Sequence, residues 1–259
     1  MRIGMIGFGK MGHMIAQAAK LHGHEIACTI DPFAKDASCV TGDPEKMKSC
    51  LLDSGVEGAI EFSHPSSVFG NIRTIIPTGI PLVVGTTGWH DRLDEVRASV
   101  EESETSLLYS SNFSIGVNLF YRIVSEAARL MAAFDEYDVA LFESHHNQKA
   151  DSPSGTALDL AKRVMDNMPR KTRLVTDCFV RKPEADELHL SSVRVGAVPG
   201  THTVWFDSAA DTIELTHTAR NREGFALGAV RALEWLTSPD AQGAKKRGVF
   251  TMKDVFNDL

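Results

Sequence analysis

The start of the chain carries the pattern that most restricts its fold. Arg2 to Ile6 is a short apolar run suited to a buried parallel strand, and Gly7-Phe8-Gly9-Lys10-Met11-Gly12 follows it directly as a complete G-x-G-x-x-G. Apolar side chains then recur at helical spacing, at Met11, Met14, Ile15, Ala18, Ala19 and Leu21. A glycine pattern between a strand and a helix predicts a dinucleotide-binding βαβ unit, with pyrophosphate at the helix N-terminus.

An acidic residue closes the second expected strand, which runs from His24 to Asp31. Asp31 stands where a carboxylate accepts hydrogen bonds from an adenosine ribose in such units. The alternative is that Asp31 only caps a turn before Pro32. Because Pro32 brings no positive charge where an Arg often binds a 2′-phosphate, we expect NADH to be used at least as well as NADPH.

Three further strand candidates, at 58–62, 80–84 and 106–109, alternate with helical segments at 68–76 and through Val100. The interval 33–55 is less regular: a helix start is indicated at Asp43-Pro44, and we assign this interval no chemistry. Polar side chains follow the strands, where open parallel sheets bind ligands: Ser63, His64, Thr86, Thr87 and Asn112. We expect them to line one rim, although helix capping is the simpler role for any single one.

The second half of the chain has a different pattern. A long amphipathic helix is expected over 115–134 and a buried strand over 139–142. Turn residues separate four more expected strands as in an antiparallel meander, at 173–180, 188–195, 201–206 and 212–218. An amphipathic helix over 223–237 and the segment 250–259 are then expected to pack back on the first domain.

The predicted fold class is therefore α/β with two domains. Residues 1–112 and 221–259 are expected to form a Rossmann-type dinucleotide-binding domain with a doubly wound parallel sheet. Residues 113–220 are expected to form an α+β domain with a mixed or antiparallel sheet, whose edge or face also suits an oligomer contact.

The stretch from Glu143 to Leu158 concentrates the reactive side chains of the chain. His145, His146 and Lys149 are expected on the loop between the 139–142 strand and a helix, where a basic trio would attract a carboxylate or supply a proton. The two adjacent His point opposite ways in extended backbone, so we expect one to face a given substrate atom. Ser152-Pro153-Ser154 resembles a cap with Pro at the first helical position, which leaves the amides of Gly155 and Thr156 to bind an anion.

Two alternative roles for the His residues stay open. His145 and His146 with His202 and His217 would offer ligands for zinc, but the chain lacks H-x-x-x-H spacing and clustered Cys, so we expect no metal. The adjacent pair would otherwise be hydrogen-bonded structural His. The nearby Lys149 and the anion-binding helix start favour a functional role.

Composition limits the partners. The chain has 27 Lys and Arg against 34 Asp and Glu, a net charge of -7, which argues against nucleic acid as a partner and favours small molecules. No apolar run approaches the length that spans a membrane. The four Cys form no C-x-x-C pair, and no signal-like start precedes the first strand, which fits a cytoplasmic protein with reduced thiols.

The segment Glu143-Ser144-His145-His146-x-x-Lys149-x-Asp151-x-Pro153-Ser154-Gly155-Thr156-Ala157 resembles the signature of the dihydrodipicolinate reductase family, also called 4-hydroxy-tetrahydrodipicolinate reductases. The resemblance covers the whole chain, because further segments stand in the family's order: the glycine loop, Gly85-Thr86-Thr87, 112–118, 200–204 and 217–222. It implies NAD(P)H-dependent reduction of a cyclic dicarboxylate imine in diaminopimelate and lysine biosynthesis, by a protein that is typically a homotetramer joined through the second domain.

The resemblance also implies roles for individual residues. His145 would be a proton donor or acceptor and Lys149 a proton donor, and His146, Gly155 and Thr156 would contact substrate carboxylates. Cofactor contacts would come from Gly7, Phe8, Gly9, Lys10, Met11, Gly12, Asp31, Gly85, Thr86, Thr87, Ser110, Ser111, Asn112 and Phe113. Closure of the two domains would bring nicotinamide and substrate together and exclude water.

Two departures from the family pattern bear on cofactor preference. The glycine loop is one residue shorter than the commoner G-x-x-G-x-M-G form, and Pro32 stands where Arg is frequent; Ser152 for a commoner Ala is expected to matter little. Two other functions remain open. One is a two-domain NAD(P)-dependent reductase of another amino-acid or sugar derivative, and the other is a non-catalytic, NAD-sensing protein.

Overall fold

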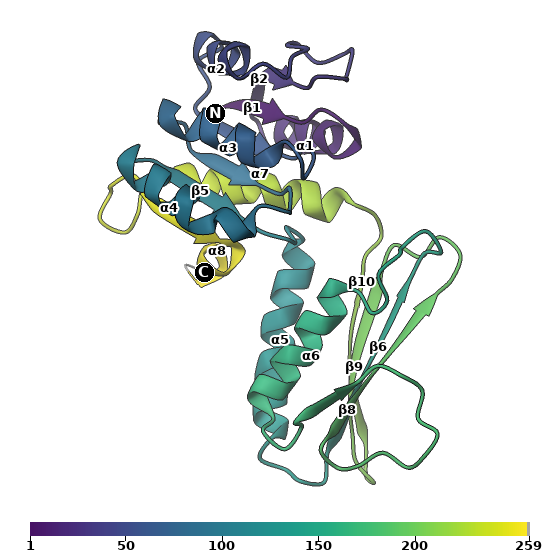
Figure 1. Ribbon diagram of the computed structural model, residues 1–259. Coiled ribbons are helices and arrows are strands. Elements are labelled where there is room, and N and C mark those ends of the chain that lie inside the picture. The colour runs from purple at the N-terminus through teal and green to yellow at the C-terminus, as the bar shows by residue number, and fades with distance from the viewer. Residues whose placement is uncertain (258–259) are drawn as a thin grey trace. The chain divides into compact units, whose positions relative to one another are not determined.

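The computed structural model describes residues 1–257, and the chain divides into two compact units (Figure 1). The first unit comprises Met1–Ile115 together with the chain from Glu223 onward, and the second unit comprises Gly116–Arg222. The predicted boundaries, after residues 112 and 220, lie three and two residues before the observed ones. The first boundary falls later because Phe113 and Ile115 pack in the core of the first unit.

The first unit is built on a parallel sheet whose six strands, within residues 1–257, follow the order β11-β5-β4-β3-β1-β2. Their bounds are β1 Arg2–Ile6, β2 Glu25–Ile30, β3 Gly58–Glu61, β4 Leu82–Val84, β5 Ser106–Tyr109 and β11 Gly248–Thr251. The chain passes from β1 to β2 on one side and returns to β3 on the other. Ligands bind at such a switch point, beyond the carboxyl ends of the strands.

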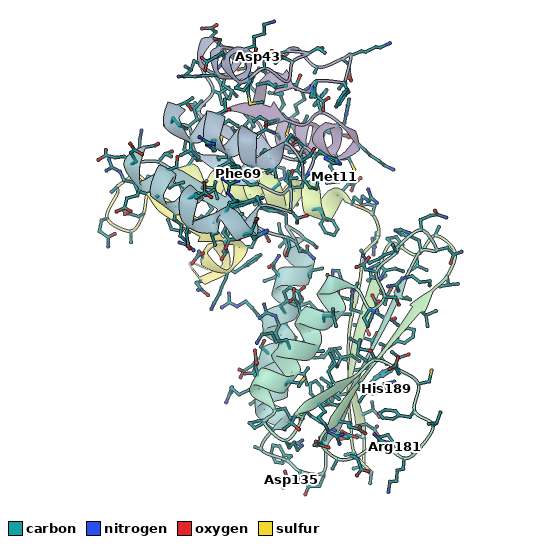
Figure 2. The ribbon with its side chains drawn as sticks, viewed as in Figure 1. Met11, Asp43, Phe69, Asp135, Arg181 and His189 are labelled. Carbon is teal, nitrogen blue, oxygen red and sulfur yellow. The ribbon has the colours of Figure 1, made fainter. Side chains whose placement is uncertain are left out.

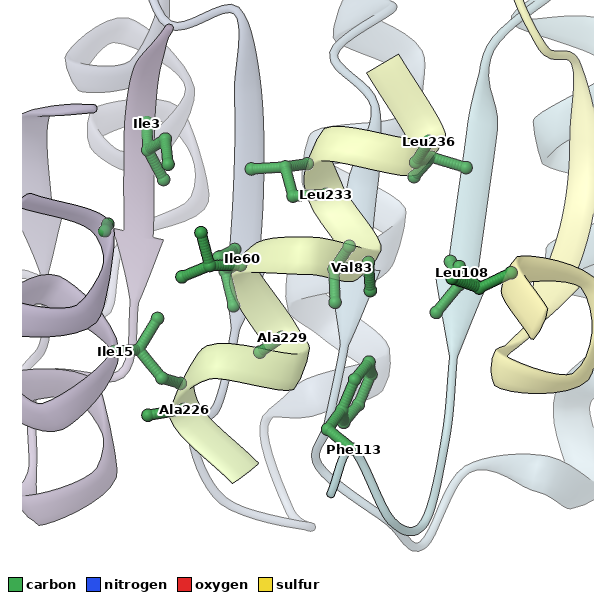
Figure 3. Close-up of a cluster of buried hydrophobic side chains, with 14 of the residues drawn as sticks. Ile3, Ile15, Ile60, Val83, Leu108, Phe113, Ala226, Ala229, Leu233 and Leu236 are labelled. Carbon is green, nitrogen blue, oxygen red and sulfur yellow. The ribbon is translucent and has the colours of Figure 1, made fainter. Parts of the chain in front are cut away.

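Helices cover both faces of this sheet, which confirms the doubly wound prediction. One face packs against α1 (Lys10–Leu21), α7 (Glu223–Thr237) and α8 (Met252–Asn257), and Figure 3 shows Leu233 and Ala229 of α7 against Ile60 of β3. The other face packs against α2 (Pro44–Asp53), α3 (Val68–Ile75) and α4 (Leu93–Glu102). Met11 packs against the first of these cores and Phe69 against the second; both are labelled in Figure 2.

Local sequence accounts for the less regular parts of this unit. Asp43 caps α2 by accepting the N–H of Lys46, and Pro44 occupies the first turn of that helix, as the Asp-Pro pair predicts. Short 3₁₀ turns follow α3 at Ile76–Thr78 and precede α4 at His90–Arg92. The segment 250–259 was predicted to pack on the first domain without an assigned structure, and it contributes the end of strand β11 and helix α8. Its residues 258 and 259 lie outside the described part of the chain.

The second unit has a five-stranded sheet in the order β10-β9-β6-β8-β7. Its elements are α5 Ile115–Met131, β6 Asp138–His145, α6 Gly155–Asn167, β7 Arg173–Val175, β8 Glu187–Arg194, β9 Thr201–Asp207 and β10 Thr212–Thr218. Helices α5 and α6 lie along one face of this sheet, over a core that includes Leu141, Leu190 and Val204 (Figure 1). The opposite face carries the half-exposed rings of Phe142 and Trp205.

The sheet is mixed, which is one of the two forms predicted for this domain, but the antiparallel meander expected for its strands is wrong. Strand β6 lies between β8 and β9, parallel to β8 and antiparallel to β9, so β8 and β9 do not pair although they are consecutive in the chain. Only the β9–β10 hairpin has the predicted form. The expected strand 173–180 ends at Val175, because the chain then forms the loop in which Arg181 pairs with Glu187. Among residues 1–257, no helix is both long and apolar enough to cross a bilayer.

Candidate active site

Different constraints act on the three glycines of the loop after β1, Gly7, Gly9 and Gly12. Gly7 has φ +84°, and a Cβ on it would lie 2.3 Å from the carbonyl oxygen of Phe62; a Cβ on Gly12 would lie 2.3 Å from the carbonyl oxygen of Gly7. Both are therefore required by the packing of the chain itself. A Cβ on Gly9 would meet nothing within 4 Å, although Gly9 is the N-cap of α1. This open space at a helix N-terminus fits the close approach of a pyrophosphate.

Asp31 follows β2 and is anchored to the glycine loop. Its Oδ2 accepts the N–H of Phe8 at 2.8 Å, and its Oδ1 accepts the N–H groups of Phe33 and Ala34 at 2.7 and 2.9 Å. Burial raises the pKa of Asp31, but these three hydrogen bonds outweigh it and hold the pKa below its ordinary value. Asp31 thus caps a turn, which is the alternative role predicted for it, and is also an ionised carboxylate with acceptor positions left for a ribose hydroxyl.

The ends of β3 and β4 form a connected rim. The hydroxyl of Thr86 accepts the N–H of Ser63 at 2.8 Å. Gly85 lies against the ring of Phe62, which a Cβ would meet at 2.0 Å. Beneath them Glu61 is fully buried, and burial raises the pKa of its carboxyl. Thr87 and His64 are exposed beside this rim.

The turn after β5 presents backbone rather than side chains. The Ser110 hydroxyl accepts the N–H of Asn112 and donates to its carbonyl oxygen, and the Asn112 side chain accepts the N–H of Ser114. Ser111 is exposed, whereas Phe113 is only 2% exposed and packs in the core of the first unit. The ring of Phe113 is therefore unable to contact a ligand at the rim, and only its backbone is available.

In the second unit, strand β6 is longer than predicted and carries the first reactive histidine. His145 is the last residue of β6 and not part of the following loop. Because side chains alternate along a strand, Glu143 and His145 point to the same buried side, while His146 lies just beyond the strand and is half-buried. The predicted opposite orientation of the two His is consistent with this burial.

Strand register brings two more side chains to this position. In the pairing of β6 with β9, His202 lies opposite Glu143, and in the pairing with β8, Arg194 lies opposite His145. Glu143 is 0% exposed, His145 8% and His202 5%. Gly200, which has φ +143°, lies so close to His145 that a Cβ would be 2.8 Å from its Nε2.

Glu143 is the buried charge around which these groups are arranged. Its Oε1 accepts the guanidinium of Arg194 at 2.9 Å and the N–H of Ser154 at 2.9 Å. Its Oε2 lies 2.7 Å from Nδ1 of His145 and 3.7 Å from Nε2 of His202. Burial raises the pKa of Glu143, but the hydrogen bonds from Ser154 and Arg194 and the charge of His145 hold it below its ordinary value.

Both imidazoles are held neutral near pH 7. Burial lowers the pKa of His145, the charge of Glu143 raises it in part, and the charges of Lys149 and Arg194 lower it further, so that the pKa lies below its ordinary value. Burial and the neighbouring His145 lower the pKa of His202 to about 4. A neutral imidazole beside an ionised carboxylate and a cation is suited to proton transfer.

Arg194 holds the loop that carries the reactive lysine. Its guanidinium donates to the carbonyl oxygens of Lys149, at 3.3 Å, and of Asp151, while also binding Glu143. Within this loop, the ammonium of Lys149 lies 2.8 Å from Oδ1 of Asp151 and is partly buried. The loop is therefore fixed to the strand that carries His145.

Helix α6 begins at Gly155, with Ser154 as its N-cap: the Ser154 hydroxyl accepts the N–H of Ala157 at 3.2 Å. The prediction of Pro153 at the first helical position is wrong, because Pro153 precedes the cap. Gly155 and Thr156 are the first two helical residues, where backbone N–H groups point out of the helix end. A Cβ on Gly155 would meet nothing within 4 Å, which leaves room for an anion to approach.

The structure adds two residues to the predicted site and changes the role of a third. Glu143 belonged to the stretch but received no role, although alternation with His145 along a strand was a usable signal. Arg194 had no local signal, because it reaches the site through pairing of β8 with β6. His202 was considered only as a zinc ligand with His145, His146 and His217; in the structure it joins Glu143 and His145, and His217 pairs with it on β10.

Comparison with protein-family models gives two adjacent matches that account for nearly the whole chain. Residues 1–113 match the model described as "Dihydrodipicolinate reductase, N-terminus", and residues 116–256 match "Dihydrodipicolinate reductase, C-terminus". The junction between the two matches coincides with the boundary between the two units, near residue 115.

Curated relatives named 4-hydroxy-tetrahydrodipicolinate reductase are similar over nearly their full length. The protein of Christiangramia forsetii is 38% identical over 259 residues, covering 100% of this chain and 99% of its own. The protein of Archaeoglobus fulgidus is 35% identical, covering 98% and 99%, and that of Clostridium novyi 34%, covering 95% and 94%.

A solved structure supports the same fold. A dipicolinate-bound dihydrodipicolinate reductase from Paenisporosarcina sp. TG-14 superposes with a TM-score of 0.73 over 96% of this chain and 97% of its own, at 21% sequence identity. A probable dehydrogenase from Thermotoga maritima, 11% identical, superposes with a TM-score of 0.55 over 100% of this chain and 89% of its own. From the two family models and the relatives above 30% identity, we conclude that the chain belongs to the dihydrodipicolinate reductase family.

Proposed function

We propose that this protein reduces 4-hydroxy-tetrahydrodipicolinate to tetrahydrodipicolinate with a nicotinamide cofactor, in the diaminopimelate route to lysine. The observation that carries the proposal is the buried Glu143–His145 pair, fixed by Arg194 to the loop of Lys149 and by Ser154 to the start of α6. One strand, one loop and one helix start thus hold the groups for proton transfer and carboxylate binding together in the second unit.

The first unit holds the cofactor. The open space at Gly9 accepts the pyrophosphate, Asp31 accepts the adenosine ribose, and the rim of Gly85, Thr86 and Thr87 with the backbone of 110–113 lies along the rest of the dinucleotide. When bound, the nicotinamide supplies the hydride. The remaining residues of the loop, Phe8, Lys10, Met11 and Gly12, place the N-terminus of α1 for this contact.

Proton handling falls to His145 and Lys149. The 4-hydroxyl group of the substrate leaves as water, which gives a conjugated imine. Hydride addition to this imine leaves negative charge on the ring, so a proton must follow and nearby positive charge lowers the barrier. Lys149 supplies positive charge and a proton, and His145, neutral and oriented by Glu143, exchanges a proton at its imidazole. Glu143 is a positioning residue, because its contacts are with His145, Arg194 and Ser154.

Carboxylate recognition falls to His146 and to the N–H groups of Gly155 and Thr156. Helix N-termini bind anions through backbone N–H groups and the helix dipole. The open space at Gly155 lets a carboxylate approach this helix end closely. Two carboxylates on one ring would then be held in register with the proton donors.

For cofactor preference, we propose that NADH is used at least as well as NADPH. Asp31 is held ionised by three N–H groups, and an ionised carboxylate next to the ribose repels a 2′-phosphate. For assembly, we propose a homotetramer joined through the open face of the second unit's sheet. A cytoplasmic location fits free thiols at Cys28, Cys39, Cys50 and Cys178.

A coupled assay tests this function. The substrate is generated by the preceding synthase, and oxidation of NADH and NADPH is followed separately at matched concentrations. We expect turnover with both cofactors, and a loss on the order of a hundredfold or more in His145→Ala and in Lys149→Ala, with NADH affinity unchanged by direct titration.

Several outcomes would contradict the proposal. No oxidation with either cofactor would refute the reductase function outright. Full activity in the Lys149→Ala variant would refute the assigned proton donor, and a preference for NADPH would refute the argument from Asp31. Turnover of other imines but not of this substrate would identify a different reductase.

A further inference from the structure

We infer that Glu143, His145 and His202 form a binding site for a divalent transition-metal ion of the zinc class, and that an ion bound there inhibits the enzyme. The three side chains are nine-tenths or more buried, and each offers a ligand atom within 4.8 Å of the others. Within the described residues they are the one group of this kind. The ligands come from strands β6 and β9, so no sequence spacing announces them.

The distances suit a tetrahedral ion after small movements. Ligand atoms about 2.0–2.1 Å from Zn²⁺ lie about 3.3 Å from each other in a tetrahedral site. Oε2 of Glu143 lies 2.7 Å from Nδ1 of His145 and 3.7 Å from Nε2 of His202, one distance shorter and one longer than that value. To hold the ion, the first distance would lengthen by about 0.6 Å and the second would shorten by about 0.4 Å. The hydroxyl of Ser154, 3.2 Å from Nε2 of His202, is the contact that the ion displaces.

Two of the three ligand atoms have no other hydrogen-bond partner, and the contacts of Glu143 hold its carboxylate in place. Although Oε2 of Glu143 and Nδ1 of His145 are close, they are not aligned for a hydrogen bond, and neither has another hydrogen-bond partner in the described part of the chain. The other carboxylate oxygen, Oε1, is fixed by Arg194 and by the N–H of Ser154. Such outer contacts orient a metal-binding carboxylate. Neutral imidazoles and an ionised carboxylate are also the protonation states that bind metal.

The donor set selects the class of ion. Two imidazoles and one carboxylate suit Zn²⁺, Co²⁺, Ni²⁺ and Cu²⁺, whereas Mg²⁺ and Ca²⁺ require oxygen donors. Three protein ligands leave one coordination position for water, as in catalytic zinc sites; structural zinc sites have four protein ligands. The positive charges of Arg194 and Lys149 oppose the ion, so binding is reversible and weaker than in a structural zinc site.

The inhibitory part rests on the proposed function of His145. An ion on Nδ1 takes one of the two nitrogen positions that both carry protons in imidazolium. His145 is then unable to take up and release a proton, and the ion holds it against Glu143. The binding part does not depend on the reaction, which lets the two parts be tested separately.

Metal binding is tested with the full chain and without substrate, because a cyclic imine dicarboxylate itself chelates metal. Zn²⁺ is measured by calorimetry, and Co²⁺ by its visible absorption, which is intense in four-coordinate sites. We expect one ion per chain in the wild type, and binding weakened on the order of a hundredfold in His202→Ala and Glu143→Gln. His13→Ala is the matched control, because His13 lies 2.7 Å from one carboxylate, Asp36, but belongs to no three-ligand group.

Thermal unfolding of each variant shows whether it is folded, and His202→Gln replaces any variant that is not. Equal metal binding in wild type and folded His202 variants, or no Co²⁺ absorption in the wild type, would overturn the site.

For inhibition, NADH oxidation is measured after preincubation with Zn²⁺ and dilution into substrate. We expect activity to fall in proportion to occupancy and to return with EDTA; full activity at full occupancy would overturn the inhibitory role. If the protein binds one ion at these residues but does not reduce the substrate, the proposed function is refuted and the metal site is not.

Discussion

Gly9 and Gly12 belong to the same motif but have different surroundings, so we expect the same substitution to affect them differently. A Cβ on Gly9 meets nothing within 4 Å, and the φ of Gly9, -80°, is accessible to alanine. We predict that Gly9→Ala lowers the free energy of unfolding by less than about 1 kcal/mol, the scale of an N-cap change. It should weaken NADH binding by about tenfold or more, because the methyl group occupies the space of the pyrophosphate. Fluorescence titration with NADH and chemical unfolding measure the two effects.

The matched variant is Gly12→Ala, whose Cβ would lie 2.3 Å from the carbonyl oxygen of Gly7. Because backbone must move to relieve this contact, we expect a loss of about 2 kcal/mol or more, although alanine normally favours a helix. Equal stability of the two variants would contradict the assignment of separate roles to these glycines.

Glu61 makes stability depend on pH in the direction opposite to most carboxylates. Burial raises its pKa, and Oε2 has no hydrogen-bond partner among the described residues. In the interval between the unfolded and the folded pKa, the folded chain binds more protons, so stability falls as pH rises. We predict that Glu61→Gln, which carries no titrating proton, gains stability relative to wild type as pH rises above the ordinary pKa of a glutamate, about 4.3.

Thermal unfolding of both proteins across this interval is the measurement. Parallel curves for wild type and Glu61→Gln would mean that Glu61 titrates at the same pH in both states. The variant keeps an acceptor for the Ser63 N–H and the Asn71 amide, which limits any change to the charge itself.

At the scale of elements, two neighbouring residues at the start of α6 are expected to serve different purposes, Gly155 in substrate binding and Ser154 in the stability of the helix. Gly155 is the first helical residue and has open space where a Cβ would stand. We predict that Gly155→Ala keeps or raises the free energy of unfolding, by up to about 1 kcal/mol, because alanine favours the helix. The KM for substrate should rise by about tenfold, since the methyl group keeps a carboxylate from the helix end, while the KM for NADH stays unchanged.

Ser154→Ala is the control at the same helix end. The Ser154 hydroxyl caps α6 and lies 3.2 Å from His202, so its loss should cost about 1 kcal/mol of stability. If Gly155→Ala destabilises the protein as much as Ser154→Ala does, then glycine at position 155 is needed for the stability of α6, and the argument for substrate binding fails.

Strand β6 shows where local patterns were misleading. The apolar run 139–142 predicted a strand, but Glu143 and His145 looked like loop residues because both are polar. They continue the strand because Arg194, His202 and the N–H of Ser154 surround Glu143 with partners, so that a buried carboxylate is tolerated. The alternation of Glu143 with His145 places both on one side of the strand, but the partners that make a buried charge tolerable are known only once the opposite strands are.

At the scale of the whole molecule, the open face of the second sheet bears on assembly. Helices α5 and α6 pack on one face, and the other carries Phe142 and the 36%-exposed Trp205, whose ring centroids are 6.2 Å apart. Apolar patches of this kind mark contacts between proteins. We predict that sedimentation or light scattering gives the mass of about four chains, and that Trp205→Glu yields smaller species with unchanged secondary structure. A monomeric wild type would refute the tetramer.

The sequence alone predicted the fold class of the first unit and the segment that carries His145 and Lys149. Glycines at required positions, an acidic residue after a second apolar run and a helix start close to Gly155 are local signals, because backbone geometry and capping act within a few residues. The mixed order of the second sheet and the roles of Arg194 and His202 were decided only by tertiary structure. They depend on which strands lie beside β6, and that choice is made by long-range packing and register, which leave no mark at any single position.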